Sequence, residues 1–315
     1  MAFKKITITS IEGLTVGHKV DEKAKTGCTA LLAPKRVKAA CFNPGFAPGS
    51  RETDLLNPKN SFAAIHGLCL AGGSAFGLAA AGGVVRFLRE NGFGLDLDVI
   101  KIPLVPAAVI FDYPLNLSQG TLPDELMGYQ AAQAASSSPV RSGPFGVGYS
   151  ARSGKLGGLD GSSPSGLGSF GLEVNKVKMA ALAAVNPFGS VIDPLTGKVL
   201  SGFKIGRGQK GQIAPREKIF QTLLSYAQDE PGPTNTVLII LATDAFLSPL
   251  DLHRLAIMAS AGIARSIYPA FTPYDGDFVF ALTTDDSPAK NIDLTWLGAL
   301  AQDVVSQAIV NSVPK

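Results

Sequence analysis

The sequence predicts an α+β protein in which layers of helices cover sheets, and three observations lead to this fold class. Apolar residues make up 46% of the 315 residues and charged residues only 17%, so the chain has much to bury. Short apolar runs typical of strands alternate with longer apolar stretches typical of buried helices. Consecutive strand-like runs often lie close enough in sequence to form hairpins, and the helices are expected to pack against the resulting sheets.

In the N-terminal half, glycine and proline separate the expected elements. A loop rich in proline, glycine and charge is expected over 43–57. The uncharged stretch 67–85 is about as long as a membrane span, but its six glycines favour a buried strand followed by a buried helix. That helix is expected to stop at Asn91-Gly92. The full set comprises strands at 6–8, 29–33, 39–42 and 107–111, apolar structure at 61–70, and helices at 75–90 and 121–136.

In the C-terminal half, residues 237–242 form the clearest buried strand of the sequence. Ser248, Pro249 and Asp251 have the pattern of an N-cap, a proline at the first helical position and an acidic third position, so a helix is expected from there to about 265. The Gly/Ser-rich stretch 143–171 is expected to be a long functional loop. Further expected elements are a hairpin of 174–185 with 190–193, a helical segment within 204–230, a strand at 278–282 and a helix at 293–312.

Charge and cysteine content exclude several classes of protein. The net charge is +3 and no basic stripe is present, which argues against a nucleic-acid partner. Cys28, Cys41 and Cys69 show no CxxC spacing, and a sparse, odd set of cysteines is typical of a reducing compartment. The first residues lack the apolar stretch of a signal peptide. The protein is therefore expected in the cytoplasm, without association with a membrane.

Several catalytic templates are not met. Residues 72–76 depart from the nucleophile elbow G-x-S-x-G at the last position, and 148–155 has one residue too many for a P-loop. Residues 146–151 resemble a dinucleotide fingerprint, but no clear strand precedes them. Neither a cofactor nor a metal ion is therefore expected. The three histidines lack metal-ligand spacing and are interpreted as packed or surface residues: His18, His66 and His253.

The Asn235-Thr236 pair offers a different chemistry. It follows the breaker Pro231-Gly232-Pro233 and leads directly into the clearest strand. An N-terminal threonine can use its own α-amino group as base, and that amine has an ordinary pKa of about 7.7–8.0. Thr236 gains such an amine only if the chain is cut after Asn235. The local sequence alone favours an ordinary turn that enters a strand.

The wider sequence resembles the P1 family of self-processing aminopeptidases, which includes L-aminopeptidase/D-alaninamide esterases, β-peptidyl aminopeptidases and nylon-oligomer endohydrolases. The resemblance runs nearly from end to end, with several long motifs in the right order. Tyr149-Ser150 and Pro187 depart from the family pattern beside the expected pocket, which puts the substrate preference in doubt. The motifs are 11–18, 48–54, 72–78, 102–112, Val185-Asn186, Asn235-Thr236 and 242–245.

The resemblance implies a four-layer α-β-β-α sandwich of the N-terminal-nucleophile type, formed by one domain over 1–315. The precursor would cut itself into an α-chain, 1–235, and a β-chain, 236–315, which would assemble further as a tetramer of processed protomers. Thr236 would be the nucleophile, as in the nylon-oligomer branch. The implied roles of the other residues are orientation of the nucleophile by Asp275 and Asp277, orientation or charge stabilisation by Lys155, and donation to an oxyanion by Asn186 and Tyr113.

The implied activity is hydrolysis of amide bonds through an acyl-enzyme. The substrate would be a short peptide, an amino-acid amide or ester, or an oligomer of β- or ω-amino acids. Two alternatives remain open at the level of the sequence. One is an acyltransferase of the self-cleaving ornithine acetyltransferase type, and the other is a binding protein that is never cut and has no enzymatic activity.

Overall fold

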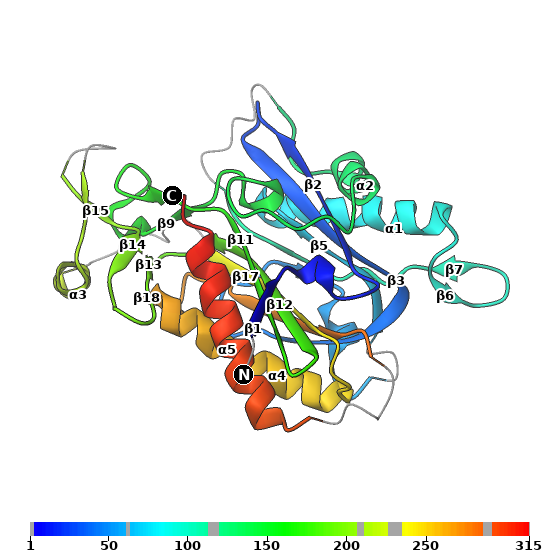
Figure 1. Cartoon of the computed structure of the whole chain (residues 1–315). Helices are drawn as coiled ribbons and strands as arrows, with labels where there is room; N and C mark the ends of the chain where they lie inside the picture. Colours follow the sequence, from blue (N-terminus) through cyan, green and yellow to red (C-terminus); the bar gives the residue numbers. More distant parts are fainter. Residues whose placement is uncertain are drawn as a thin grey trace.

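The computed structural model describes residues 3–60, 64–112, 120–206, 211–225, 235–285 and 292–314. Ten strands of this part of the chain form one continuous hydrogen-bonded sheet (Figure 1), in the order β1-β11-β12-β17-β19-β3-β5-β8-β4 with β2 also paired to β3. The strands are β1 (Phe3–Ile6), β2 (Thr15–Asp21), β3 (Thr26–Phe42), β4 (Ser50–Arg51), β5 (Ala64–Ala71), β8 (Ala107–Val109), β11 (Leu167–Val174), β12 (Val177–Asn186), β17 (Thr236–Thr243) and β19 (Phe278–Thr283).

The long strand β3 joins the two halves of this sheet. Its first part pairs with β2, whereas its last five residues, 38–42, pair with β19. Between these parts the register to β5 shifts at Leu32–Val37, and Arg36 adopts a left-handed backbone with φ of 58°. The two halves therefore share a strand, although the sequence patterning had suggested two separate strands at 29–33 and 39–42.

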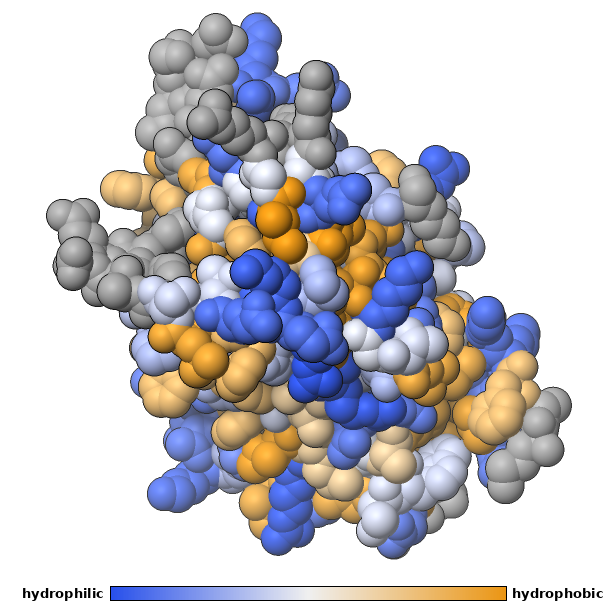
Figure 2. Space-filling model, turned by 90° about the vertical axis from the view of Figure 1, so that its left-hand side faces the viewer, coloured by the Kyte–Doolittle hydropathy of each residue, from blue (hydrophilic) through white to orange (hydrophobic). Residues whose placement is uncertain are grey.

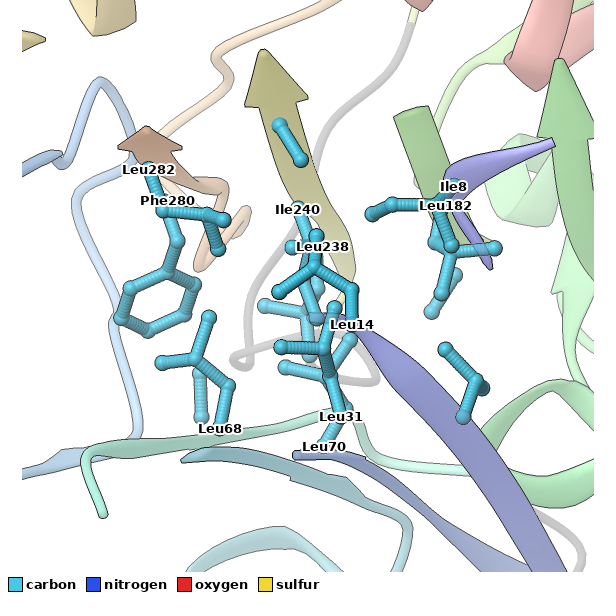
Figure 3. Packing of buried hydrophobic residues seen from close by; sticks show 14 of the residues in the cluster. Ile8, Leu14, Leu31, Leu68, Leu70, Leu182, Leu238, Ile240, Phe280 and Leu282 are labelled. Atoms are coloured by element: carbon cyan, nitrogen blue, oxygen red, sulfur yellow. The ribbon is translucent and has the colours of Figure 1, made fainter. Parts of the chain in front are cut away.

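One of the two main core clusters lies between the two halves of the sheet. Figure 3 shows Leu238, Ile240 and Phe280 from one half facing Leu31, Leu68 and Leu70 from the other. Because side chains alternate along a strand, the intervening residues of β17 and β19 point to the opposite face. There they contribute to a second core cluster beneath two helices.

Helices cover the outer faces of both halves. In Figure 1, α4 (Pro249–Ser266) and α5 (Leu294–Asn311) lie together against the half that contains β17, and α1 (Ala80–Glu90) and α2 (Glu125–Gln133) lie against the half that contains β5. Ser248 accepts a hydrogen bond from the Asp251 amide at 3.1 Å and so caps α4, as predicted. The order helix, sheet, sheet, helix confirms the four-layer α+β architecture.

Smaller elements surround this sandwich. A three-stranded sheet and three two-stranded sheets lie at its periphery, together with the short helix α3 (Arg216–Leu224). On the face shown in Figure 2, hydrophobic residues occupy several separate areas between hydrophilic ones. The peripheral strands are β6 (Leu95–Asp96), β7 (Lys101–Ile102), β9 (Arg152–Ser153), β10 (Ser163–Pro164), β13 (Ser190–Ile192), β14 (Val199–Ser201), β15 (Lys204–Ile205), β16 (Gln212–Ile213) and β18 (Ile267–Tyr268).

Three predictions of secondary structure were wrong. The expected loop 143–171 contains the start of β11, because its glycines serve close packing: a Cβ at Gly168 would clash with the Ala308 carbonyl of α5. The expected hairpin of 174–185 with 190–193 does not form, since β12 pairs with β11 and β17 while β13 pairs with β14 and β18. At the N-terminus, Ile8 opens a 3-10 turn instead of ending a strand.

The remaining predicted elements are present with shifted ends. The apolar stretch 67–85 is a strand followed by a helix, as expected, and within the described residues no helix has the length and apolarity needed to cross a membrane. The three cysteines are free, and the Sγ atoms of Cys28 and Cys69 lie 3.6 Å apart in the interior.

Candidate active site

Thr236 is the first residue of β17 and lies opposite Asn186, the last residue of β12. Its side chain continues the row of Leu238 and Ile240, so it points toward the space between the two halves of the sheet. Thr236 is only 4% exposed and Asn235 only 1%. In the uncut chain, the predicted nucleophile therefore lies at the end of the central core and not in an open cleft.

Asn235, on the N-terminal side of the bond to Thr236, is held by hydrogen bonds of both its amide and its carbonyl. The Asn235 amide donates to the Tyr274 carbonyl at 3.1 Å, and the Asn235 carbonyl accepts from the Gly276 amide at 2.6 Å. The Thr236 hydroxyl Oγ1 lies 2.5 Å from the same carbonyl oxygen. The hydroxyl and the carbonyl that it would attack are thus already in contact, which is the proximity that an intramolecular reaction needs.

Asp275 and Asp277 belong to the segment that lies beside this bond. Asp277 Oδ1 accepts from the Val237 amide at 2.7 Å, one residue beyond the predicted nucleophile. Asp275 Oδ2 accepts from both the amide and the hydroxyl of Thr272, at 2.8 and 2.7 Å. Asp275 Oδ1 accepts from the Phe188 amide at 3.2 Å. The carboxyl of Asp275 is therefore fixed by the protein and not by Thr236.

The loop after β3 supports the segment that carries both aspartates. The amides of Phe46 and Ala47 donate to the Asp275 carbonyl at 2.8 and 3.0 Å, and the Gly45 amide donates to the Asp277 carbonyl at 3.3 Å. These bonds hold 275–277 alongside the start of β17. The sequence alone gave no signal for this contact, because it joins residues more than 200 positions apart.

Lys155 and Asn186 form the other side of the site. The ammonium Nζ of Lys155 donates to the Asn186 backbone carbonyl at 2.9 Å. The Asn186 side chain donates through Nδ2 to the Phe111 carbonyl at 2.8 Å and accepts through Oδ1 from the Arg152 amide at 3.0 Å. In the uncut chain, the side-chain amide of Asn186 is thus bonded to backbone groups.

Burial lowers the pKa of the lysine and raises the pKa values of the aspartates, so it favours the neutral form of each group. It lowers the pKa of Lys155 to about 7, although the nearby carboxylate of Asp275 opposes the shift. Burial also raises the pKa of Asp275, against the lowering effect of its hydrogen bonds to Thr272. The pKa of Asp277 is raised strongly, first by burial and then by the charge of Asp275. An amine and carboxyls that change protonation nearer to neutral pH are suited to proton transfer.

Asp112 is a further buried acid that the sequence interpretation used only as part of a motif. Its Oδ1 accepts from the Gly73 amide at 2.8 Å, and burial raises its pKa, whereas the charge of Lys155 lowers it. A side chain at Gly72 would clash with Asp112 Oδ2 and with the Thr26 hydroxyl. The glycines of the 72–78 motif therefore leave room for this carboxyl.

Sequence reasoning also missed Thr272, Gly276 and Arg152, each of which contacts a predicted site residue. Tyr113 and the breaker Pro231-Gly232-Pro233 lie outside the described residues. Of the predicted residues that are described, Asn186, Lys155, Asn235, Thr236, Asp275 and Asp277 all fall in one hydrogen-bonded region. Among the residues described, no group of three histidine, cysteine or acidic side chains could hold a metal ion.

The chain is similar to a known peptidase family and to several of its relatives. Residues 7–315 match the model of peptidase family S58. An uncharacterized aminopeptidase of Mycobacterium tuberculosis is 38% identical over 98% of this chain and 93% of its own length. A 6-aminohexanoate-oligomer endohydrolase of Kocuria sp. is 28% identical over 95% of this chain and 84% of its own.

Solved structures agree on the fold. The L-aminopeptidase D-Ala-esterase/amidase of Ochrobactrum anthropi, described as a variant of the Ntn hydrolase fold, superposes with a TM-score of 0.71 at 21% identity, covering 97% of this chain and 85% of its own. A Burkholderia sp. β-aminopeptidase superposes with a TM-score of 0.66 at 18% identity, covering 97% and 85%. The N-terminal-nucleophile fold is thus confirmed, as is the resemblance to aminopeptidases and amide hydrolases. The chain is an enzyme, so the interpretation as a non-enzymatic binding protein is set aside: it belongs to peptidase family S58.

Proposed function

We propose that this chain is the precursor of an amide hydrolase that activates itself by scission between Asn235 and Thr236. The observation that carries the proposal is the contact of 2.5 Å between Thr236 Oγ1 and the carbonyl oxygen of Asn235, a residue whose amide and carbonyl are both held by the segment 274–277. The hydroxyl attacks the carbonyl carbon, its proton passes to the Thr236 nitrogen, and the resulting ester is hydrolysed by water. Thr236 then begins a new chain with a free α-amine.

The same hydroxyl serves the second reaction. The new amine of Thr236 accepts the hydroxyl proton while the oxygen attacks the amide or ester carbonyl of a substrate, and water hydrolyses the acyl-enzyme. The roles proposed for the charged residues are orientation of the new ammonium group by Asp275 and Asp277, and stabilisation of negative charge by Lys155. The bonds of Asp277 to the Val237 amide and of Lys155 to the Asn186 carbonyl support these roles. The Asn186 amide and Tyr113 are the proposed donors to the substrate oxyanion.

The substrate class proposed is a short molecule with an accessible amide: a small peptide, an amino-acid amide or ester, or an oligomer of β- or ω-amino acids. The relatives named above are described as aminopeptidases or as an endohydrolase of 6-aminohexanoate oligomers, which favours hydrolysis over acyl transfer. L-Alanine p-nitroanilide, β-alanine p-nitroanilide and the linear 6-aminohexanoate dimer represent these classes in a screen.

Intact mass under denaturing conditions tests the proposal most directly. Wild type should give two fragments that meet between Asn235 and Thr236, whereas Thr236→Ala should remain one chain and lack hydrolytic activity. Thr236→Ser, which keeps a hydroxyl, should still be cut. A wild-type chain that stays uncut after long incubation, or a Thr236→Ala chain that is cut at the same bond, would exclude Thr236 as the nucleophile.

A further inference from the structure

The carbonyl oxygen of Asn235 is the atom on which negative charge develops during scission. In the uncut chain it accepts two hydrogen bonds, from Thr236 Oγ1 at 2.5 Å and from the Gly276 backbone amide at 2.6 Å. When the hydroxyl becomes the attacking group, it no longer donates to this oxygen. The amide of Gly276 is then the donor that remains in place.

In the uncut chain, the side chains of Asn186 and Lys155 donate to other carbonyl groups and not to the Asn235 carbonyl. Asn186 Nδ2 already donates to the Phe111 carbonyl, and Lys155 Nζ donates to the Asn186 carbonyl. A donor that is fixed by the backbone needs no rearrangement as the charge appears, which is the condition for efficient stabilisation of an oxyanion. The Gly276 amide meets this condition. Hydrogen bonds from the loop 45–47 to the carbonyls of Asp275 and Asp277 hold the segment that contains it.

We propose that the backbone N–H of Gly276 is the oxyanion donor of the scission reaction. The inference rests on the proposed function, because it assumes attack by Thr236 on Asn235. In the step concerned, the Thr236 Oγ1–Asn235 carbon bond forms, the carbonyl oxygen becomes an oxyanion bonded to Gly276 N–H, and the Asn235 carbon–Thr236 nitrogen bond then breaks. The hydroxyl proton ends on that nitrogen, leaving an ester and a free amine. Scission and substrate turnover therefore use different donors.

The position also requires glycine. A Cβ at residue 276 would lie 2.5 Å from the Ala47 carbonyl oxygen and 3.0 Å from Thr236 Oγ1. Any side chain would thus push against the attacking oxygen and against the loop that supports the segment. For this reason Gly276→Ala mixes crowding with the loss of geometry and is not the decisive variant.

Replacing the Gly276 N–H by oxygen, through incorporation of glycolic acid in cell-free translation, removes the donor without adding a side chain. The matched control is the same change at Gly197, whose amide donates to the Asp193 carbonyl at 2.8 Å in the turn between β13 and β14. Both changes delete one glycine donor, but only one lies at the scissile bond. Translation also provides a zero time for scission, which is followed by intact mass.

Loss of one oxyanion donor should slow scission at Asn235–Thr236 by about 10²–10³-fold. The Gly197 ester should be cut at the wild-type rate, within about twofold. A Gly276 ester that is cut as fast as the Gly197 ester overturns the inference while leaving Thr236 as the nucleophile. A wild-type chain that is never cut overturns the proposed function itself, and the inference with it.

A second measurement does not depend on the ester variant folding. In uncut Thr236→Ala, the Asn235 carbonyl is labelled with ¹³C and ¹⁸O and its infrared stretching band is recorded. With Thr236 Oγ1 absent, a band at the low frequency of a strongly hydrogen-bonded carbonyl supports donation from Gly276. A band at the frequency of a carbonyl without a donor overturns the inference.

Discussion

Strand β17 is buried along its whole length, yet its beginning and its middle are buried in different ways. From Val237 to Ala242 every side chain is apolar and fully buried, and successive residues pack alternately between the half-sheets and under α4 and α5. At Thr236 the surroundings are an asparagine, a lysine and two aspartates. The middle is held by packing, whereas the beginning is held by hydrogen bonds to fixed backbone groups. The comparison teaches that a polar cluster can be buried as completely as an apolar strand when hydrogen bonds stabilise it.

Substitution of Lys155 should show the difference between the beginning and the middle of β17 most clearly, because it should change the rate of scission and not the stability. Lys155→Met keeps the length of the side chain but removes the charge. Scission should slow by about 10–10²-fold, because the ammonium beside Asn186 favours the developing negative charge from a distance while Gly276 donates to the oxyanion directly. Stability should not fall with it, because the loss of the donor to the Asn186 carbonyl is offset by relief of the cost of burying the ammonium, whose pKa burial lowers to about 7. Intact-mass time courses and chemical unfolding measure the two effects.

The lowered pKa of Lys155 should make the free energy of unfolding depend on pH. The pKa of Lys155 falls from its ordinary value of 10.5 to about 7 in the folded chain, so the unfolded chain binds the proton more tightly. The free energy of unfolding should therefore rise between about pH 7 and 10.5, and the cost of burying the charge is fully present below pH 7. In an uncut Thr236→Ala background, Lys155→Met should abolish this rise. An unchanged rise would show that Lys155 titrates normally.

Thr272 should have a smaller effect that is confined to the same end of the strand. Thr272→Val removes the hydroxyl that donates to Asp275 Oδ2 at 2.7 Å, a bond that lowers the pKa of that carboxyl. The acid limb of the pH–rate profile of scission should move to higher pH, with a rate loss of about tenfold, since hydrogen bonds to charged groups contribute about 1.5–3 kcal/mol. Thr272→Ser keeps the hydroxyl, so equal profiles for the two variants would contradict the role assigned to it.

A substitution in the middle of β17 should lower stability slightly and leave scission unchanged. Ile240→Val removes one buried methylene between the half-sheets and should lower the free energy of unfolding by about 0.5–1.5 kcal/mol, with scission unchanged. Ile102→Val in β7, where the side chain is 41% exposed, is the matched control and should cost less. Urea unfolding of uncut chains measures both. A slowed scission in Ile240→Val would mean that packing and reactivity along β17 are not separable.

The same contrast explains what could be predicted from the sequence. The runs that became the middle of β17 and most of β19 have an unbroken apolar character, and the cap of α4 has its local signature in Ser248, Pro249 and Asp251, so these elements follow from neighbouring residues. The order of strands does not follow, because β17 and β19 are parallel neighbours linked through α4 while β3 joins both halves.

The site was predictable only as a set of motifs. Nothing in the local sequence brings Lys155 to the Asn186 carbonyl or Asp277 to the Val237 amide; the resemblance supplied these residues, and long-range pairing brings them together. Gly276 stayed unrecognised because its role depends on a backbone amide whose partner, the Asn235 carbonyl, is distant in sequence. Thr272 stayed unrecognised although Asp275 is only three residues away, because a Thr-x-x-Asp spacing in a turn does not by itself indicate a site. Backbone donors leave no mark in an amino-acid sequence.

The position of β17 within the sheet also determines what a cut at Asn235 would leave behind. β17 lies between β12 and β19, and β19 in turn pairs with β3, so the two strands that 236–315 contributes to the large sheet are enclosed between strands of 1–235. The fragments would be interleaved and not merely docked. Separating them would require breaking the ladder on both sides at once and exposing the core beneath α4 and α5. A nicked molecule of this kind inherits its shape from the uncut precursor, so folding must come first and the cut second.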